Sequence, residues 1–223
     1  MINHDNRLMT KRVGIFGGTF DPVHLGHIHA ARAVAHEFSL DHIYLVPAHQ
    51  PVHRDNPGAT SEQRMQMINL AIADDESLLV DGRELQRGGP SYSLLTVQEY
   101  REEYPADQLF FLLGTDAFNG LTSWYHWQEL FDFVNFIVMG RPDIQLATDV
   151  EAASFLNHRL SDRPVSSDQV AGHIFISKKA MLTNSATEVR QAIAANLPLS
   201  GLLNKKVASF IKEHNIYRKD LLK

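Results

Sequence analysis

The segment formed by residues 13–31 restricts the fold of this chain more than any other. Its first four residues are apolar, which is typical of a buried strand, and Gly17 and Gly18 follow where the chain must turn. A helical pattern begins near Leu25, with apolar residues at spacings of three and four. A strand, a glycine turn and a helix in this order predict the first part of a βαβ unit.

Short apolar runs and helical patterns alternate along the rest of the chain. Further strands are predicted at residues 41–46, 78–80, 109–113, 135–139 and 173–176. Helices are predicted near residues 60–73, 91–104, 149–159, 183–195 and 205–214, whereas the polar residues 81–90 predict a loop. This alternation predicts an α/β fold, with a doubly wound, mostly parallel open sheet and helices on both faces. We expect a single domain over residues 1–223, with a core at residues 1–180 and a helical C-terminal part at residues 181–223.

Composition narrows the class of partner. The chain has 223 residues, of which 44% are hydrophobic, enough for a continuous core. Its net charge of −5 argues against nucleic acid as a partner, since that needs a clustered basic surface. The absence of cysteine excludes disulfides, thiolate zinc ligands and thiol catalysis. With no signal-peptide pattern and no apolar run near the ~20 residues of a membrane span, we expect no membrane partner and a cytoplasmic location.

Four polar clusters follow predicted strands or open predicted helices, at residues 17–27, 53–54, 114–116 and 185–190. Arg141 adds a cation after a further strand. Because parallel strands end at the same edge of a sheet, we expect these clusters to converge there. Free N–H groups at a helix start attract anions, and His24 and His27 stand at the entrance to a predicted helix. The first cluster therefore predicts a nucleotide-phosphate site.

Other phosphate and metal motifs are absent from the sequence. It contains neither G-x-x-x-x-G-K-[ST] nor G-x-G-x-x-G, which argues against a P-loop enzyme and against ordinary dinucleotide binding. H-E-x-x-H is also absent, which excludes that class of zinc protease. His24 and His27 could be two metal ligands, but no third ligand is evident, so we expect no metal held by the protein itself.

Residues 17–27, Gly-Gly-Thr-Phe-Asp-Pro-Val-His-Leu-Gly-His, resemble the [H/T]-x-G-H signature of the nucleotidyltransferase superfamily, and most of all the bacterial nicotinate-nucleotide adenylyltransferases. The second motif of that superfamily, near I-S-S-T-x-x-R, is similar to residues 184–190. Asn184 departs at the isoleucine position and Ala186 at the second serine. Further similarities cover most of the chain except residues 143–170. The resemblance implies a Rossmann-like nucleotidyltransferase fold.

The resemblance also implies a reaction. AMP would pass from ATP to nicotinate mononucleotide, giving nicotinate adenine dinucleotide and pyrophosphate, by direct in-line attack without a covalent enzyme intermediate. His24, His27 and Arg190 would be the catalytic residues. Mg²⁺ would be the cofactor, carried by the ATP phosphates and water.

Other positions are assigned by the same resemblance. The implied ATP-binding residues are Gly17, Gly18, Thr19, Phe20, Gly114, Asp116, Arg141, Ser185 and Thr187. The implied mononucleotide-binding residues are Arg54, Ser93, Trp124 and Tyr125. An aromatic face suits a pyridine ring, which makes Trp124 the candidate for stacking. Asp116 would hold the adenosine ribose or help to place the metal, and the resemblance favours the ribose.

Several alternatives stay open at this stage. Trp124 could pack in the core, and Asp116 could cap a helix. Arg54 and Arg190 could be solvated surface cations. A related adenylyltransferase could prefer nicotinamide mononucleotide or another phosphate acceptor, and a nucleotide-binding regulator without turnover would keep the glycines. The sequence leaves open a homo-oligomer, the kinetic order, the role of residues 143–170 and the groups that recognise the pyridine carboxylate.

Overall fold

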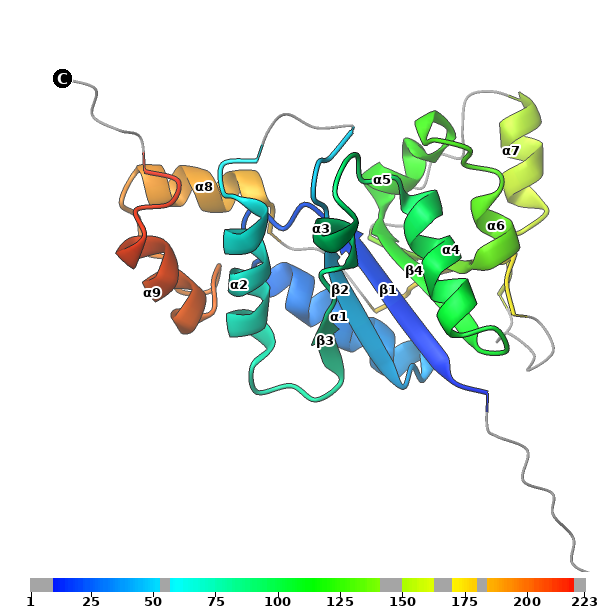
Figure 1. Ribbon diagram of the computed structural model, residues 1–223, viewed down its shortest axis with the longest axis horizontal. Helices are drawn as coiled ribbons and strands as arrows, with labels where there is room; N and C mark the ends of the chain where they lie inside the picture. Colours follow the sequence, from blue (N-terminus) through cyan, green and yellow to red (C-terminus); the bar gives the residue numbers. More distant parts are fainter. Residues whose placement is uncertain (1–9, 53–56, 141–149, 163–169, 180–183, 219–223) are drawn as a thin grey trace, which may run out of the picture.

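The computed structural model describes residues 10–52, 57–140, 150–162, 170–179 and 184–218. Its strands form one six-stranded sheet in the order β3-β2-β1-β4-β5-β6, and every neighbouring pair is parallel (Figure 1). The strands are β1 (Arg12–Gly18), β2 (His42–Pro47), β3 (Leu78–Val80), β4 (Gln108–Gly114), β5 (Asn135–Met139) and β6 (Ile174–Ile176). The predicted doubly wound parallel sheet is therefore confirmed.

Helices cover both faces of the sheet (Figure 1). They are α1 (Leu25–Phe38), α2 (Ser61–Ile72), α3 (Arg83–Arg87), α4 (Ser93–Glu103), α5 (Thr115–Asn119), α6 (Leu130–Phe133), α7 (Val150–Asn157), α8 (Ala186–Ala194) and α9 (Lys205–Glu213), with a 3₁₀ turn, η1 (Leu121–Ser123). One core contains side chains of α1, α2, α8 and α9, and the other contains side chains of α4, α5, α6 and α7. Among the described residues, no helix is long and apolar enough to cross a membrane.

The central strand β4 shows how the two cores share one sheet. Phe110 and Leu112 belong to the core of α1, whereas Leu109, Phe111 and Leu113 belong to the core of α4. Successive side chains of a strand point to opposite faces, so a strand covered on both sides must be apolar throughout. This explains the uninterrupted apolar run at residues 109–113.

The predicted loop at residues 81–90 is wrong in part, because it contains the short helix α3. The Asp81 carboxylate accepts the Arg83 backbone N–H at 2.8 Å and thereby begins the turn. The helix ends where the Gly88 N–H donates to the Glu84 carbonyl, with Gly88 at a φ of 71° that favours glycine. Five mostly polar residues carry no apolar stripe from which this helix could be predicted.

The C-terminal helices bring the second sequence motif beside the first. Val189 and Ile193 of α8 and Val207 and Phe210 of α9 are buried in the core that also contains α1. The two helices lie with α2 at one side of the sheet, away from α4 and α7 (Figure 1). The division of the chain near residue 180 stays a prediction.

Candidate active site

A cavity of about 2010 Å³ opens at the carboxyl ends of the strands. Glycines at these ends line it: Gly17 and Gly18 at β1, Gly114 at β4 and Gly140 after β5. The strand order reverses between β1 and β4, and open parallel sheets bind their ligands at such a switch point. Without a side chain, each glycine lets a ligand approach the backbone closely.

The structure brings most of the predicted site residues together in this cavity. Those lining it are Gly17, Gly18, Thr19, Phe20, His27, Ser93, Gly114, Asp116, Trp124, Tyr125 and Arg190. His24, Ser185 and Thr187 do not line it. Arg54 and Arg141 lie outside the described residues.

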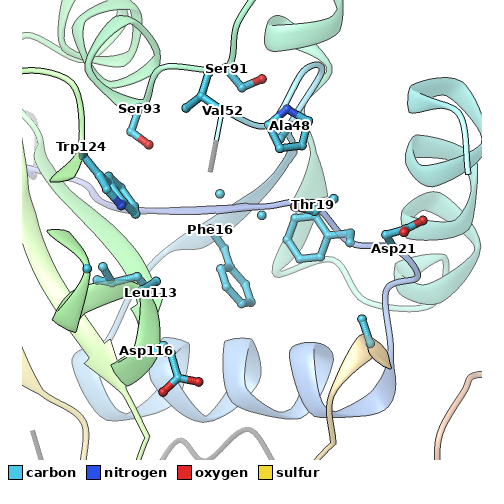
Figure 2. A pocket seen from close by; sticks show the side chains of 18 of the residues that line it. Phe16, Thr19, Asp21, Ala48, Val52, Ser91, Ser93, Leu113, Asp116 and Trp124 are labelled. Atoms are coloured by element: carbon cyan, nitrogen blue, oxygen red, sulfur yellow. The ribbon is translucent and has the colours of Figure 1, made fainter. Parts of the chain in front are cut away.

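Two ends of the cavity differ in character. Figure 2 shows Trp124 and Ser93 on one side and Thr19 and Asp21 on the other, with Phe16 between them. We call the group Thr19, Asp21, His27 and Arg190 the histidine end. We call the group Tyr92, Ser93, Trp124 and Tyr125 the aromatic end.

The turn after β1 is held by aromatic packing. A side chain at Gly18 would place its Cβ 3.1 Å from the Phe20 ring, so only glycine fits without movement. Phe20 has a φ of 50° and is only 2% exposed, and its ring lies edge-on to His27 with centroids 5.0 Å apart. Phe20 therefore supports His27 by ring contact although it also borders the cavity.

His24 and His27 share one face of the first turn of α1, as the spacing predicts. Their rings stack with centroids 3.7 Å apart. The His24 backbone N–H donates to His27 Nδ1 at 3.2 Å, so a neutral His27 carries its proton on Nε2. His27 faces the cavity, whereas His24 is 3% exposed and lies behind it.

Burial decides the charge of His24. It lowers the pKa of His24 to about 4, and the nearby Glu188 carboxylate opposes the shift only in part. His24 is therefore neutral near pH 7. Within the described part of the chain, its Nδ1 is a buried atom without a hydrogen-bond partner.

The second motif begins α8 with a capping box. Ser185 Oγ accepts the Glu188 N–H at 3.2 Å, and the Glu188 carboxylate accepts the Ser185 N–H at 2.7 Å. Such a reciprocal pair satisfies the free N–H groups of a helix start. Ser185 therefore fixes the start of the helix that carries Arg190, one turn further on.

Arg190 joins the two motifs. Its Nη1 donates to the Asp21 carbonyl at 2.6 Å, across 169 residues of sequence, and lies 3.7 Å from Asp21 Oδ2. Its Nη2 donates to Thr187 Oγ1 at 3.2 Å, which gives Thr187 a role beside the guanidinium. Arg190 is not a simple surface cation, because both of its terminal nitrogens, Nη1 and Nη2, donate hydrogen bonds while its side chain still lines the cavity. It also borders a second cavity of about 630 Å³, which Thr187 and Tyr217 line.

The aromatic end combines packing with exposure. The Trp124 ring lies edge-on to Phe111 at 6.1 Å on one side and faces the cavity on the other (Figure 2). Tyr125 is 49% exposed, and its ring lies 4.6 Å from that of Tyr92. In contrast, Trp127 packs against Phe155, with ring centroids 5.1 Å apart.

Several lining residues were not predicted as site residues. Glu84 and Thr96 are 7% and 1% exposed, and Thr96 Oγ1 donates to Glu84 Oε1 at 2.6 Å. Asp21 is 6% exposed and accepts hydrogen bonds from the distant Gly58. Asp21 lies within the motif at residues 17–27, whereas no local pattern pointed to Glu84.

The histidine end offers donors for an anion. Beside the Asp21 carboxylate it supplies an imidazole, a guanidinium and the backbone of a glycine turn. In the described part of the chain, no three His, Asp or Glu side chains lie close enough together to hold a metal ion. Asp116, in the first turn of α5, lines the cavity and lies below Leu113 in Figure 2. A phosphorylated ligand with a hydroxyl-bearing sugar matches this set of groups.

Comparison with known proteins agrees with this geometry. The model of the cytidylyltransferase-like family matches residues 15–192, so the chain belongs to this class of nucleotidyltransferase. A protein of Pseudomonas fluorescens described as a probable nicotinate-nucleotide adenylyltransferase is 42% identical over 216 residues, covering 94% of this chain and 99% of the relative. A protein of Pseudomonas aeruginosa with the same description is 40% identical over 215 residues, with the same coverage.

The chain therefore belongs to the nicotinate-nucleotide adenylyltransferase family. Its fold is also that of Plasmodium falciparum nicotinic acid mononucleotide adenylyltransferase complexed with NaAD. That likeness has a TM-score of 0.68 at 18% identity and covers 93% of this chain and 97% of the other. The same Plasmodium enzyme complexed with APC gives a TM-score of 0.65 at 17% identity, again with 93% and 97% coverage.

Proposed function

We propose that this chain transfers AMP from ATP to nicotinate mononucleotide, giving nicotinate adenine dinucleotide and pyrophosphate as a step of NAD biosynthesis. One observation carries the proposal above all. His27 and Arg190, from two motifs at opposite ends of the chain, border a single cavity whose other end presents Trp124. The family membership agrees with this assignment.

The reaction needs no strong base, because the attacking phosphate of the mononucleotide is already anionic. One of its oxygens forms a bond to the α-phosphorus of ATP, and the bond from that phosphorus to the bridging oxygen breaks. Pyrophosphate leaves with the electron pair. Catalysis then consists mainly of positioning and of stabilising charge at the α-phosphate.

The histidine end supplies these two effects. Nε2–H of His27 donates to an oxygen of the α-phosphate, and Arg190 stabilises the β- and γ-phosphates with its planar pair of donors. The buried His24 stays neutral and holds His27 in place through ring stacking and its backbone N–H. It is a positioning residue in this scheme. Ser185 and Thr187 fix α8 and the guanidinium.

The aromatic end receives the mononucleotide. The pyridine ring stacks on Trp124, and Ser93 lies within the same part of the cavity to face the polar groups of that substrate. Arg54 is proposed to face its phosphate on the ground of the resemblance alone. Asp116 binds the adenosine ribose, and Arg141 belongs to the ATP side.

Mg²⁺ enters with ATP in this proposal. The donors of the histidine end fit phosphate oxygens, and the described residues provide no three-ligand cluster that would hold the ion independently. When bound, Mg²⁺ supplies neutralisation of the triphosphate charge. The net charge of −5 argues against nucleic acid and acidic membranes as partners, whereas a small anionic substrate needs only a few local donors. We expect a cytoplasmic location.

A steady-state assay with two mononucleotides tests the proposal. Purified protein is mixed with ATP, Mg²⁺ and either nicotinate or nicotinamide mononucleotide, and both pyrophosphate and dinucleotide are measured. We expect a higher kcat/KM with the acid. Equal or greater efficiency with the amide would overturn the choice of acceptor, and nucleotide binding without pyrophosphate release would indicate a regulator instead.

A further inference from the structure

A partly buried group of hydrogen bonds links the C-terminal segment to the first sequence motif. The Tyr217 hydroxyl donates to Asp21 Oδ1 at 2.7 Å, across 196 residues of sequence. Asp21 also accepts the backbone N–H groups of Gly58 at 2.8 Å and Ala59 at 3.1 Å. Its carboxylate, in a residue that is 6% exposed, is thus surrounded by three neutral donors.

Arg190 depends on the same aspartate. Its Nη1 bonds the Asp21 carbonyl at 2.6 Å but stays 3.7 Å from Oδ2 of the carboxylate. The guanidinium is therefore anchored by the backbone and only attracted by the charge beside it. This arrangement leaves the Arg190 side chain 36% exposed and lets it border the large cavity.

Tyr217 is itself held firmly. Its φ of 62° lies in the left-handed region, which a bulky residue adopts only where its surroundings require it. The Ile216 N–H donates to the Ile211 carbonyl at 3.0 Å at the end of α9, and the Tyr217 ring lies against Gly58, where a Cβ would come within 3.0 Å. Burial and the Asp21 charge raise the pKa of Tyr217, so its hydroxyl remains a donor at neutral pH.

The other side of the turn is held independently of Tyr217. Arg64 is 1% exposed, and its Nη1 donates to the Thr19 carbonyl at 2.8 Å while Nε donates to the Ala59 carbonyl at 3.3 Å. Removal of the Tyr217 hydroxyl would therefore leave the backbone of the turn in place. The change would fall mainly on the Asp21 carboxylate and on the cation beside it.

We propose that Tyr217 is a positioning residue that keeps Arg190 available to ATP. By donating to Asp21, its hydroxyl shares the charge of the carboxylate, so the guanidinium is not drawn onto it. Without the hydroxyl, the Asp21 carboxylate attracts the Arg190 guanidinium more strongly. The guanidinium then moves toward Asp21, and its hydrogen bonds to the ATP phosphates become weaker. This inference rests on the proposed function in one respect, namely that Arg190 contacts the phosphates of ATP.

The first test is Tyr217→Phe, which deletes one oxygen atom. We expect KM for ATP to rise about fivefold, the usual size of one lost hydrogen bond, with kcat and KM for the mononucleotide changed less than about twofold. Tyr104→Phe is the matched control, since that hydroxyl bonds Tyr44 at 2.7 Å and neither ring lines the cavity. Equal ATP parameters for Tyr217→Phe and wild type would overturn the proposal.

A double-mutant cycle shows whether Tyr217 positions Arg190 or only holds the C-terminal segment in place. The Kd of a non-hydrolysable ATP analogue is measured by calorimetry for wild type, Tyr217→Phe, Arg190→Gln and the double variant. Because the effect runs through the guanidinium, Tyr217→Phe should weaken binding in the wild-type background and leave it unchanged in the Arg190→Gln background. The same loss in both backgrounds would contradict the proposal.

Two further measurements keep the test decisive. If Tyr217→Phe melts more than ~10 °C below wild type, Gly58→Ala is the second variant. Its Cβ would lie 3.0 Å from the Tyr217 ring, so the ring must shift by a few tenths of an ångström, and a smaller weakening of ATP binding in the same direction is expected. Analogue binding also separates the two claims. Wild type that binds ATP but forms no dinucleotide would refute the proposed function, while an unchanged Kd in the variant would refute the role of Tyr217.

Discussion

The histidine end and the aromatic end of the cavity are built in opposite ways. At the histidine end, Asp21, His27 and Arg190 are tied to the backbone or to neighbouring side chains by hydrogen bonds and ring stacking. At the aromatic end, Tyr125 is 49% exposed and meets Tyr92 mainly through ring contact. The difference suits the two substrates, because a triphosphate needs fixed charges whereas a planar ring needs a surface on which to stack.

Because the two ends are proposed to bind different substrates, kinetic measurements can distinguish a mutation at one end from a mutation at the other. Changes at the histidine end should act on kcat and on ATP, whereas changes at the aromatic end should act on the mononucleotide. A mutation whose effect appears on the wrong substrate would break this division.

His27→Ala should lower kcat on the order of 10²-fold or more, because it removes a donor to the charge that develops at the α-phosphate. His29→Ala is the matched control, since His29 is an exposed residue of the same helix. Turnover is measured by pyrophosphate release, and folding by circular dichroism. Near-normal turnover in a folded His27→Ala protein would remove His27 from the mechanism.

Arg190→Ala should raise KM for ATP roughly 30-fold, because a guanidinium that bonds phosphate oxygens is a charge-assisted donor. KM for the mononucleotide should change much less. Arg190→Lys should recover only part of the loss, since a lysine cannot form the planar pair of bonds. Complete recovery by lysine would show that charge alone matters at this position.

Stability should depend on pH through His24. Burial lowers the pKa of His24 from 6.5 to about 4, so the unfolded chain binds more protons between these two values. The contribution is fully present above pH 6.5 and is lost as the pH falls toward 4. We expect wild type to lose about 2 kcal/mol more unfolding free energy than His24→Asn between pH 7 and pH 5, measured by urea denaturation. Parallel pH profiles for the two proteins would contradict the neutral, buried state of His24.

Trp124→Ala should raise KM for the mononucleotide about tenfold through loss of ring stacking, with KM for ATP nearly unchanged. Trp124→Phe keeps an aromatic face and should lose less. Because Trp124 also packs edge-on to Phe111, the melting temperature of each variant is measured alongside. A larger effect on ATP than on the mononucleotide would reverse the assignment of the two ends.

Much of the fold follows from local patterns. The uninterrupted apolar run at residues 109–113, the strand before Gly17 and the helix after His24 are all visible in the local sequence, and each is confirmed. The polar helix α3 was missed because its five residues carry no apolar stripe. Hydrophobic periodicity reveals a helix only where one of its faces is apolar and buried, and α3 has no such face.

The site was predictable as a set of residues but not as a geometry. The spacing of His24 and His27 predicts a shared helix face, yet only the packing of the whole chain decides that His24 lies buried behind His27. The contact of Asp21 with Arg190 and Tyr217 joins residues at opposite ends of the chain. Such contacts depend on how α8 and the C-terminal segment dock, which no short stretch of sequence encodes.

The most direct test of the account is the stoichiometry of products when both substrates are present and when one is withheld. With ATP, Mg²⁺ and nicotinate mononucleotide, we predict one pyrophosphate for each nicotinate adenine dinucleotide, and neither product when the mononucleotide is absent. Pyrophosphate release from ATP alone, or consumption of ATP without dinucleotide, would contradict direct transfer between the two ends of one cavity.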